Sequence, residues 1–322
     1  MNVWLRALPL PLLLVSSTLA FAQAYPAKPL RVVVGFPAGG PIDIVARLMA
    51  PKLGEFAGQQ VVVDNRAGAN GIIGADWVAK SAPDGYTMIL ISTGTATISP
   101  HLYPKMPYDT LRDLASVALV TSTPELLVVH PSVPAKNMRE LIALAKARPG
   151  EITIASTGSG GLPHLAQELL RMVAKVNTLH VPFNGAAPAI SNTVGGQVMG
   201  VIADLPVVQP HIQSGRLRAL GIAAPNRSPL FPNVQTMTEQ GLPKLEAVNW
   251  YGIQVAAKTP PDVIAKLNEL FVKTLNDADL RQKLIARGAE PIPSSPAAST
   301  AFIKAEYDKW GPIAKESGAK VE

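Results

Sequence analysis

The sequence predicts an α/β protein with two lobes, each built on a mixed, mainly parallel sheet flanked by helices. Short β-branched runs alternate with amphipathic helical segments along most of the 322 residues, which is the pattern of strand–helix–strand units. A strand, a glycine turn and a helix at 30–53 are followed by the same arrangement at 151–174, without similar residues. The chain is also long enough to bury two hydrophobic cores.

Residues 1–24 are predicted to be a secretory signal. Arg6 precedes a largely apolar run, and this run ends at the small-x-small cleavage site Ala22–Ala24. Pro9 and Pro11 interrupt the run, which is also short for a bilayer-spanning helix. We therefore expect cleavage after Ala24 and export, without a membrane anchor.

The first strand, glycine turn and helix come next. Val32–Val34 is a β-branched run that favours a strand, and Pro41 is suited to the first position of a helix. The apolar residues of that helix share one face at helical spacing: Ile42, Val45, Ala46, Met49 and Leu53. The turn between strand and helix directs free backbone N–H groups toward one point, where the helix dipole favours negative charge. This turn is therefore a candidate anion site.

The later elements continue the alternation. Turn formers such as Pro83–Gly85 separate them, and Pro261 lies near the first position of a helix. The expected strands cover 60–63, 87–91, 117–120, 126–129, 151–155, 179–182, 198–203, 218–223 and 246–255. The expected helices cover 75–81, 137–147, 164–174, 187–194, 261–275, 278–287 and 297–317. Segments 121–124 and 246–255 are the expected crossings, so that 25–123 with 248–322 form one lobe and 124–247 form the other.

Composition and spacing argue against several functions. The net charge of +6 comes from scattered single basic residues, whereas nucleic-acid binding usually needs a concentrated basic face. The chain has no cysteine, and its five histidines lack metal-ligand spacing. Gly35 and Gly40 have Walker A spacing, but Pro41 and Ile42 stand where lysine and Ser/Thr are required. We expect no metal, no cofactor and no nucleic-acid partner.

A serine hydrolase is the catalytic alternative, and the sequence does not favour it. Ser159 has Thr157 and Gly161 where a nucleophile elbow needs two glycines. His164 or His180 could in principle act as the base, but dispersed histidines are more often structural or exposed. We therefore expect a binding protein rather than an enzyme.

The two glycine turns together suggest a clamp for an anion. Each turn offers several backbone N–H donors, and two lobes closing on a carboxylate would use both. The alternative, for either turn alone, is that its glycines only permit a tight strand-to-helix connection. The side chains that could complete the site are the hydroxyls of Thr93, Ser156, Thr157 and Ser159 and the rings of Phe36 and Phe183.

Asp43 lies in the first turn of the first helix, where its charge would partly neutralise the helix dipole. We expect it to accept hydrogen bonds from the loop amides and to fix the loop's shape. A ligand with an amine or hydroxyl could use it directly.

Several motifs resemble one family of solute receptors. They are Tyr25–Arg31, Phe36–Gly40, Asn65–Ala69, Ala82–Thr87, His180–Gly185, Gly195–Gln197, Gly215–Leu220 and Arg227–Pro229. Together they look like the Bug-type receptors of tripartite tricarboxylate transporters. The resemblance implies a type II-like, two-lobed periplasmic binding protein whose lobes are joined by two crossover segments. It also implies a receptor that closes around a small carboxylate and delivers it to transporter membrane subunits. We expect this receptor to be a monomer.

In this family the ligand carboxylate is held largely by backbone amides and bridging waters. The resemblance assigns these roles to the loops Phe36–Asp43 and Ser156–His164. The candidate ligand-binding residues are Phe36, Ala38, Gly39, Gly40, Ile42, Asp43, Thr93, Ser156, Thr157, Gly158, Ser159, Gly160, His164, Phe183, Asn184, Gly185, Ala203 and Asp204.

Three departures from the family pattern bear on the ligand. Pro41 and Ile42 stand where the family usually has a small residue and threonine. Pro163 replaces a usual serine or threonine, and the common Asp-Asn before Leu-Pro is Ala203-Asp204. These changes favour a less polar carboxylate, such as an aromatic one, and dicarboxylates and tricarboxylates are the alternative ligands.

Two other functions would use the same features. The ligand-loaded protein could dock on a membrane histidine kinase, instead of a permease or in addition to it. A periplasmic hydrolase would turn over esters and lose that activity when Ser159 is changed.

Overall fold

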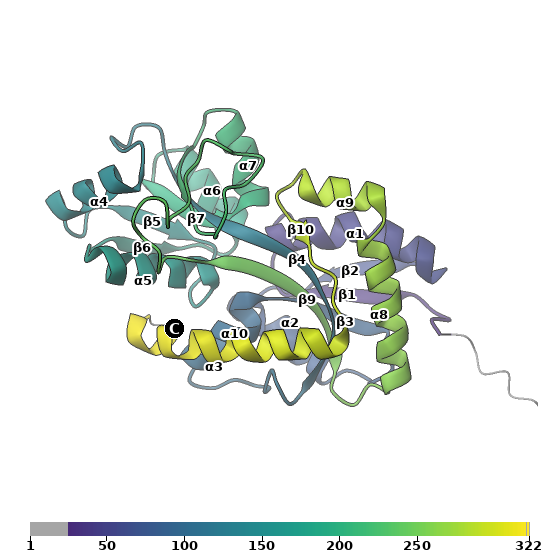
Figure 1. Cartoon of the computed structure of the whole chain (residues 1–322). Helices are drawn as coiled ribbons and strands as arrows, with labels where there is room; N and C mark the ends of the chain where they lie inside the picture. The colour runs from purple at the N-terminus through teal and green to yellow at the C-terminus, as the bar shows by residue number, and fades with distance from the viewer. Residues whose placement is uncertain (1–24, 320, 322) are drawn as a thin grey trace, which may run out of the picture.

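The computed structural model describes residues 25–319 and residue 321, so the predicted secretory signal lies outside the described residues. Helices surround a curved mixed sheet in two lobes (Figure 1). The ten described strands follow the order β2-β1-β3-β9-β4-β7-β5-β6, with β8 and β10 paired to β4. None of the described helices is both long and apolar enough to span a membrane.

The element bounds are close to those expected. The strands are β1 (Leu30–Val34), β2 (Val61–Asn65), β3 (Thr87–Ser92), β4 (Leu114–Val129), β5 (Thr153–Ser156), β6 (Leu179–Pro182), β7 (Gly200–Asp204), β8 (Arg218–Ile222), β9 (Val248–Ala256) and β10 (Glu290–Pro291). The helices are α1 (Pro41–Ala57), α2 (Ile72–Ala79), α3 (Ser99–Leu102), α4 (Met138–Ala147), α5 (Leu162–Ala174), α6 (Ala186–Val194), α7 (Leu205–Gln213), α8 (Pro261–Leu275), α9 (Ala278–Ile285) and α10 (Pro296–Ser317). Two short helical segments are η1 (Ala69–Gly71) and η2 (Gly94–Ile98).

The first lobe is organised around β1. It pairs in parallel with β2 and β3, and β3 then pairs antiparallel with β9. Helix α1 begins at Pro41 after Gly40, and Gly58 ends it in the left-handed conformation that favours glycine. The apolar face of α1 packs with α8 over the sheet, where Met49, Leu53 and Phe271 are fully buried. This packing fixes the direction in which the first glycine turn faces.

Strands β4 and β9 join the lobes, as the two expected crossings do. Strand β4 pairs antiparallel with β9 as far as Pro124, and from Glu125 onward it pairs with β7 and β8. The two strands expected at 117–120 and 126–129 form one continuous strand, because pairing with β9 keeps 121–124 extended, and Thr121 and Thr123 are fully buried. The boundaries 123/124 and 247/248 stay a prediction.

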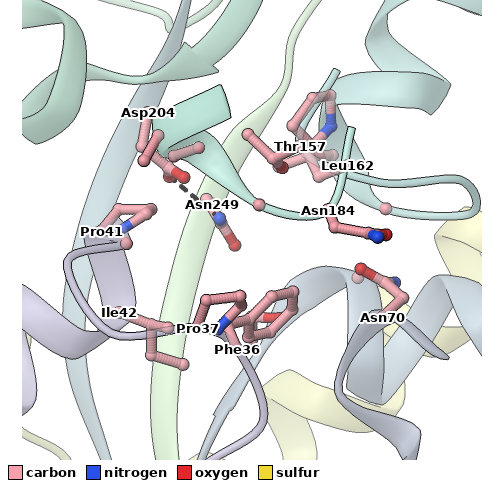
Figure 2. A pocket seen from close by; sticks show the side chains of 18 of the residues that line it. Phe36, Pro37, Pro41, Ile42, Asn70, Thr157, Leu162, Asn184, Asp204 and Asn249 are labelled. Carbon is pink, nitrogen blue, oxygen red and sulfur yellow. Dashed lines mark hydrogen bonds between the residues drawn. The ribbon is translucent and has the colours of Figure 1, made fainter. Parts of the chain in front are cut away.

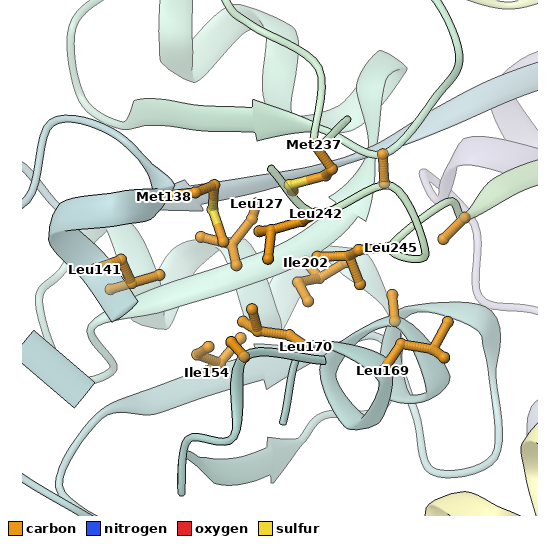
Figure 3. Close-up of a cluster of buried hydrophobic side chains, with 14 of the residues drawn as sticks. Leu127, Met138, Leu141, Ile154, Leu169, Leu170, Ile202, Met237, Leu242 and Leu245 are labelled. Atoms are coloured by element: carbon orange, nitrogen blue, oxygen red, sulfur yellow. The ribbon is translucent and has the colours of Figure 1, made fainter. Parts of the chain in front are cut away.

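The second lobe repeats the parallel arrangement around β5, which pairs with β6 and β7. A buried cluster on one face of this sheet includes Leu127, Leu170, Ile202 and Met237 (Figure 3). Antiparallel pairing at β4 completes the sheet, which is mixed, as expected.

Helix α10 contacts both lobes. Ile303, in its first half, packs with first-lobe residues, whereas Trp310 and Ala314 belong to the cluster that includes Leu169 and Leu170 of the second lobe. The helix therefore extends from one lobe to the other, as Figure 1 shows.

Sequence patterns missed η1, η2, α3, α7 and the short β10. Segments η2 and α3 are rich in serine and threonine and contain Pro100, which lower helix propensity, but all of η2 is buried and α3 begins at the buried Ser99. Helix α7 contains Pro206 at its start and Pro210 inside, so its helical pattern was not visible. Tertiary burial overrides local preference in these segments.

Candidate functional site

The first turns of three helices converge on one cavity between the lobes. Gly40, Gly161 and Gly185 are the N-caps of α1, α5 and α6, and all three line the cavity. No side chain caps any of these helices. Pro41 and Pro163 have no N–H, so the first-turn donors left for a ligand are backbone N–H groups such as those of Ile42, Leu162 and Ala186. The space between the cavity walls, including its open mouth, is about 590 Å³. Its geometry suits a small anion held by amides and helix dipoles.

The cavity walls are mostly apolar and contain no basic side chain. Phe36, Pro37 and Ile42 from the first lobe lie across from Leu162 of the second lobe (Figure 2). The described lining residues include no lysine, arginine or histidine. The charge of an anionic ligand would therefore be balanced by backbone amides rather than by an ion pair.

One side of the cavity is formed by Asp204, Asn249 and Tyr251. Asn249 Nδ2 donates to Asp204 Oδ1 at 2.9 Å, while Asn249 Oδ1 is buried without a hydrogen-bond partner. Glu125 lies opposite Asp204 in the β4–β7 ladder, and both of its carboxyl oxygens are buried and unpartnered. Two acids are therefore adjacent in the interior, and one of them faces the cavity.

Burial controls the protonation of these acids. It raises the pKa of Asp204 to about 7, although hydrogen bonds from Asn249 and Tyr251 act in the opposite direction. Burial and then the charge of Asp204 raise the pKa of Glu125 well above its usual value. Since two adjacent buried carboxyls cannot both ionise cheaply, this pair holds a proton more tightly than a solvent-exposed acid does.

The first glycine turn is fixed by Asp43, as expected. Gly39 N–H donates to Asp43 Oδ2 at 2.9 Å, Arg47 Nε donates to the same oxygen at 2.8 Å, and Asn65 Nδ2 donates to Oδ1 at 2.9 Å. Burial opposes ionisation of Asp43, but these hydrogen bonds hold its pKa below the usual range. Its carboxylate is thus occupied within the loop.

The second glycine turn is fixed by two histidines. Gly160 N–H donates to His164 Nδ1 at 3.1 Å, and His180 Nε2 lies 2.6 Å from Ser156 Oγ. The two rings stack with centroids 3.8 Å apart. Burial lowers the pKa of His164 to about 3 and that of His180 to about 4, so both rings are neutral at physiological pH.

The predicted site residues fall into three groups. Those that line the cavity are Phe36, Ala38, Gly40, Ile42, Thr157, Asn184, Gly185 and Asp204. Those that line the adjoining outer cleft are Gly158, Ser159 and Phe183, and Gly39 lies on a separate surface hollow. Those outside these spaces are Asp43, Thr93, Ser156, Gly160, His164 and Ala203. The ligand roles of all of them stay a prediction.

Thr93 and Ser156 support the structure from behind the cavity. Thr93 Oγ1 accepts a hydrogen bond from the Trp250 backbone N–H at 2.9 Å. The Ser156 hydroxyl is fully buried and donates to the Gly158 carbonyl at 3.0 Å. The contact between Ser156 and His180 therefore orders the loop, and a nucleophile would need an accessible hydroxyl instead.

Sequence reasoning missed Asn70, Asn249 and Tyr251. Asn70 Nδ2 donates to the Gly160 carbonyl at 3.1 Å and to Ser99 Oγ at 2.8 Å, so it links the first lobe to the second glycine turn. Its signal was present, because Asn70 lies in the turn-rich loop that follows β2. Asn249 and Tyr251 reach the cavity only through the pairing of β9. Among the described residues, no group of acidic side chains and histidines is arranged to hold a metal.

The chain is similar to known solute receptors. A family model described as tripartite tricarboxylate transporter family receptor matches residues 45–319. Protein BugT of Bordetella pertussis is 40% identical over 304 residues, which cover 94% of this chain and 93% of that protein.

Two ligand-bound solved structures are also similar to this chain. The structure of R. palustris Rpa4515 with adipate has a TM-score of 0.89 and 33% identity, covering 92% of this chain and 100% of that one. MatC (Rpa3494) from Rhodopseudomonas palustris with bound malate has a TM-score of 0.85 and 32% identity, covering 90% and 100%. The fold is that of two-lobed periplasmic binding proteins, so the predicted fold class is confirmed.

Proposed function

The chain belongs to the tripartite tricarboxylate transporter receptor family, and from this premise we propose that it captures a small carboxylate between its lobes for a tripartite transporter. Family and fold are those of solute-binding receptors, and the proposed cycle has no catalytic step. Two similar solved structures contain adipate and malate, which supports a small carboxylic acid as the ligand class.

The observation that carries the proposal is the convergence of uncapped helix N-termini on a cavity without basic side chains. Gly40 presents the first turn of α1 from one lobe, while Gly161 and Gly185 present α5 and α6 from the other. A carboxylate can accept from amides on both sides, and the helix dipoles stabilise its charge. Closure of the lobes then completes the site.

Cellular placement follows from the same proposal. Residues 1–24 would direct export, with release after Ala24 into the periplasm. The mature monomer would open and close about the crossings near 123/124 and 247/248. The closed surface would be recognised by transporter membrane subunits, and the sensor kinase remains the alternative partner for that surface.

A thermal-shift assay tests the binding step. The mature protein is mixed with monocarboxylates, dicarboxylates and aromatic carboxylates, and with the corresponding neutral amides as matched controls. A ligand at about 100 times its Kd should stabilise the protein by about 2.7 kcal/mol. If no carboxylate raises Tm above its neutral control, the proposed function is wrong.

A pull-down tests the partner. Tagged protein, with and without the best carboxylate, is incubated with solubilised transporter membrane subunits and separately with a sensor kinase ectodomain. Ligand-dependent capture of the transporter supports delivery, whereas capture of the kinase alone contradicts it.

A further inference from the structure

The strongest unassigned feature is the pair of hydrogen-bond acceptors formed by Asp204 and Asn249. Asn249 uses its amide nitrogen on Asp204 Oδ1. Its carbonyl oxygen is left buried and without a partner, and it points into the cavity in Figure 2. Asp204 is 3% exposed and lines the same cavity. A buried acceptor without a donor is unfavourable, so this side of the cavity is poised for a group that donates.

The surroundings make this side of the cavity unsuitable for a second anion. Glu125, 0% exposed, lies beside Asp204 as its partner in the β4–β7 ladder. From β9, the facing groups are Asn249 and the Tyr251 hydroxyl. The described lining residues offer no basic side chain that could balance another carboxylate. An ionised group here would face acidic and carbonyl oxygens at short range.

We propose that Asp204 and Asn249 determine ligand specificity by selecting a carboxylate whose other end carries N–H or O–H donors, such as a primary amide, an amine or a hydroxyl. The inference rests on the proposed function, and it adds which carboxylates are taken. A primary amide suits the pair well, since its two N–H groups can reach two neighbouring acceptors. While Asp204 is ionised, a ligand with a second ionised carboxylate is rejected at this end.

Matched ligand series test the inference in the wild-type protein. One series is adipate, adipic acid monoamide and monomethyl adipate; the other is terephthalate, 4-carbamoylbenzoate and monomethyl terephthalate. The Kd values are measured by calorimetry at pH 8, where every free carboxyl group of these ligands is ionised. In each series that binds, the monoamide should have a Kd about tenfold or more below those of the diacid and the ester, because only the amide supplies donors.

A charge-removing variant tests the residues. Asp204→Asn keeps the size of the side chain, removes its charge and adds donors, so the ratio of diacid Kd to monoamide Kd should fall about tenfold. Asp262→Asn, on the exposed first turn of α8, removes one carboxylate far from the cavity and should leave the ratio unchanged. If Asp204→Asn does not fold, Asn249→Ser removes the unpartnered carbonyl and should weaken monoamide binding selectively.

The outcomes separate the two proposals. Carboxylate binding in which the diacid equals or exceeds its monoamide overturns the specificity inference and leaves the receptor function standing. An unchanged ratio in Asp204→Asn likewise assigns selectivity to other residues. If neither series binds and no other carboxylate does, the receptor function is overturned, and this inference with it.

Discussion

The two glycine turns present backbone amides to the same cavity, but an ionised side chain holds the first turn in place and neutral side chains hold the second. The first turn is fixed by the ionised Asp43, which accepts from Gly39, Arg47 and Asn65. The second is fixed by the neutral imidazoles of His164 and His180. The difference follows from the partners, because Asp43 and His164 are both buried. Asp43 accepts from the guanidinium of Arg47, whose side chain is 52% exposed, whereas burial and the nearby His180 and Arg171 keep His164 neutral. Two turns of similar backbone geometry can therefore be held by different kinds of side chain.

The largest effect is expected from Gly39→Val, which strains only the first turn. Gly39 has φ +80°, where a β-branched residue is unfavourable, but a Cβ there would meet no atom within 4 Å. We expect carboxylate affinity to fall more than about 100-fold, with the circular dichroism spectrum unchanged. Gly58→Val is the matched control, because Gly58 has φ +64° and equally free space at the far end of α1. Retained affinity in Gly39→Val would place the ligand elsewhere.

Asp43→Ala should have the next largest effect. It removes the acceptor of three hydrogen bonds, so the first turn loses its fixed shape, and affinity should drop about tenfold or more by calorimetry. Asp64→Ala is the control, since Asp64 also forms arginine ion pairs, with Arg31 and Arg66, but lies in β2 outside both turns. If both variants lose affinity equally, the role of Asp43 is not specific to the turn.

Acid should weaken the second turn through its histidines. Their pKa values, about 3 and 4 in the folded protein, lie below the usual 6.5, so the unfolded chain binds more protons below pH 6.5. Folding stability is therefore lost as the pH falls from 6.5 toward 4. Between pH 7.5 and 4.5, wild type should lose at least about 1 kcal/mol more than His180→Asn in urea unfolding.

Two features make the histidine comparison specific. Asp204 and Glu125 have raised pKa values, so their contribution to folding stability rises as the pH falls, opposite to that of the histidines. This contribution is the same in wild type and in His180→Asn, so it cancels when their stability losses are subtracted. His130→Asn removes an imidazole outside the turn and should follow wild type. Equal losses in wild type and His180→Asn would mean that the buried imidazole does not govern acid sensitivity.

The smallest effect is expected where the two lobes meet. Asn70→Gly removes the amide that donates to Gly160, while glycine tolerates the backbone φ of 51° at this position. Affinity should weaken about threefold, the value of one exposed or half-buried hydrogen bond. Ser99→Ala removes the amide's other partner and keeps the link between lobes. Tighter binding in Asn70→Gly would show that the link holds the protein in a form that excludes ligand.

Local patterns predicted most of the secondary structure. The spacing of Ile42, Val45 and Met49 marked α1, and Pro261 marked the start of α8. The glycine turns and the role of Asp43 were also visible, because each depends on residues only a few positions apart. Helix α7 was not predicted, because Pro210 lowers the helix propensity of this segment, and the burial of Val208 stabilises the helix through contacts with residues distant in the sequence.

The α/β class, the two glycine turns and the family could all be predicted from the amino-acid sequence, since each is encoded in short-range periodicity or in contiguous motifs. Which residues form the cavity became clear from the folded chain alone. Asn249 meets Asp204 because β9 and β7 both pair with β4, and Glu125 becomes buried by the same pairing. Such contacts join residues far apart in the chain, and burial then sets their protonation, which no local pattern can reveal.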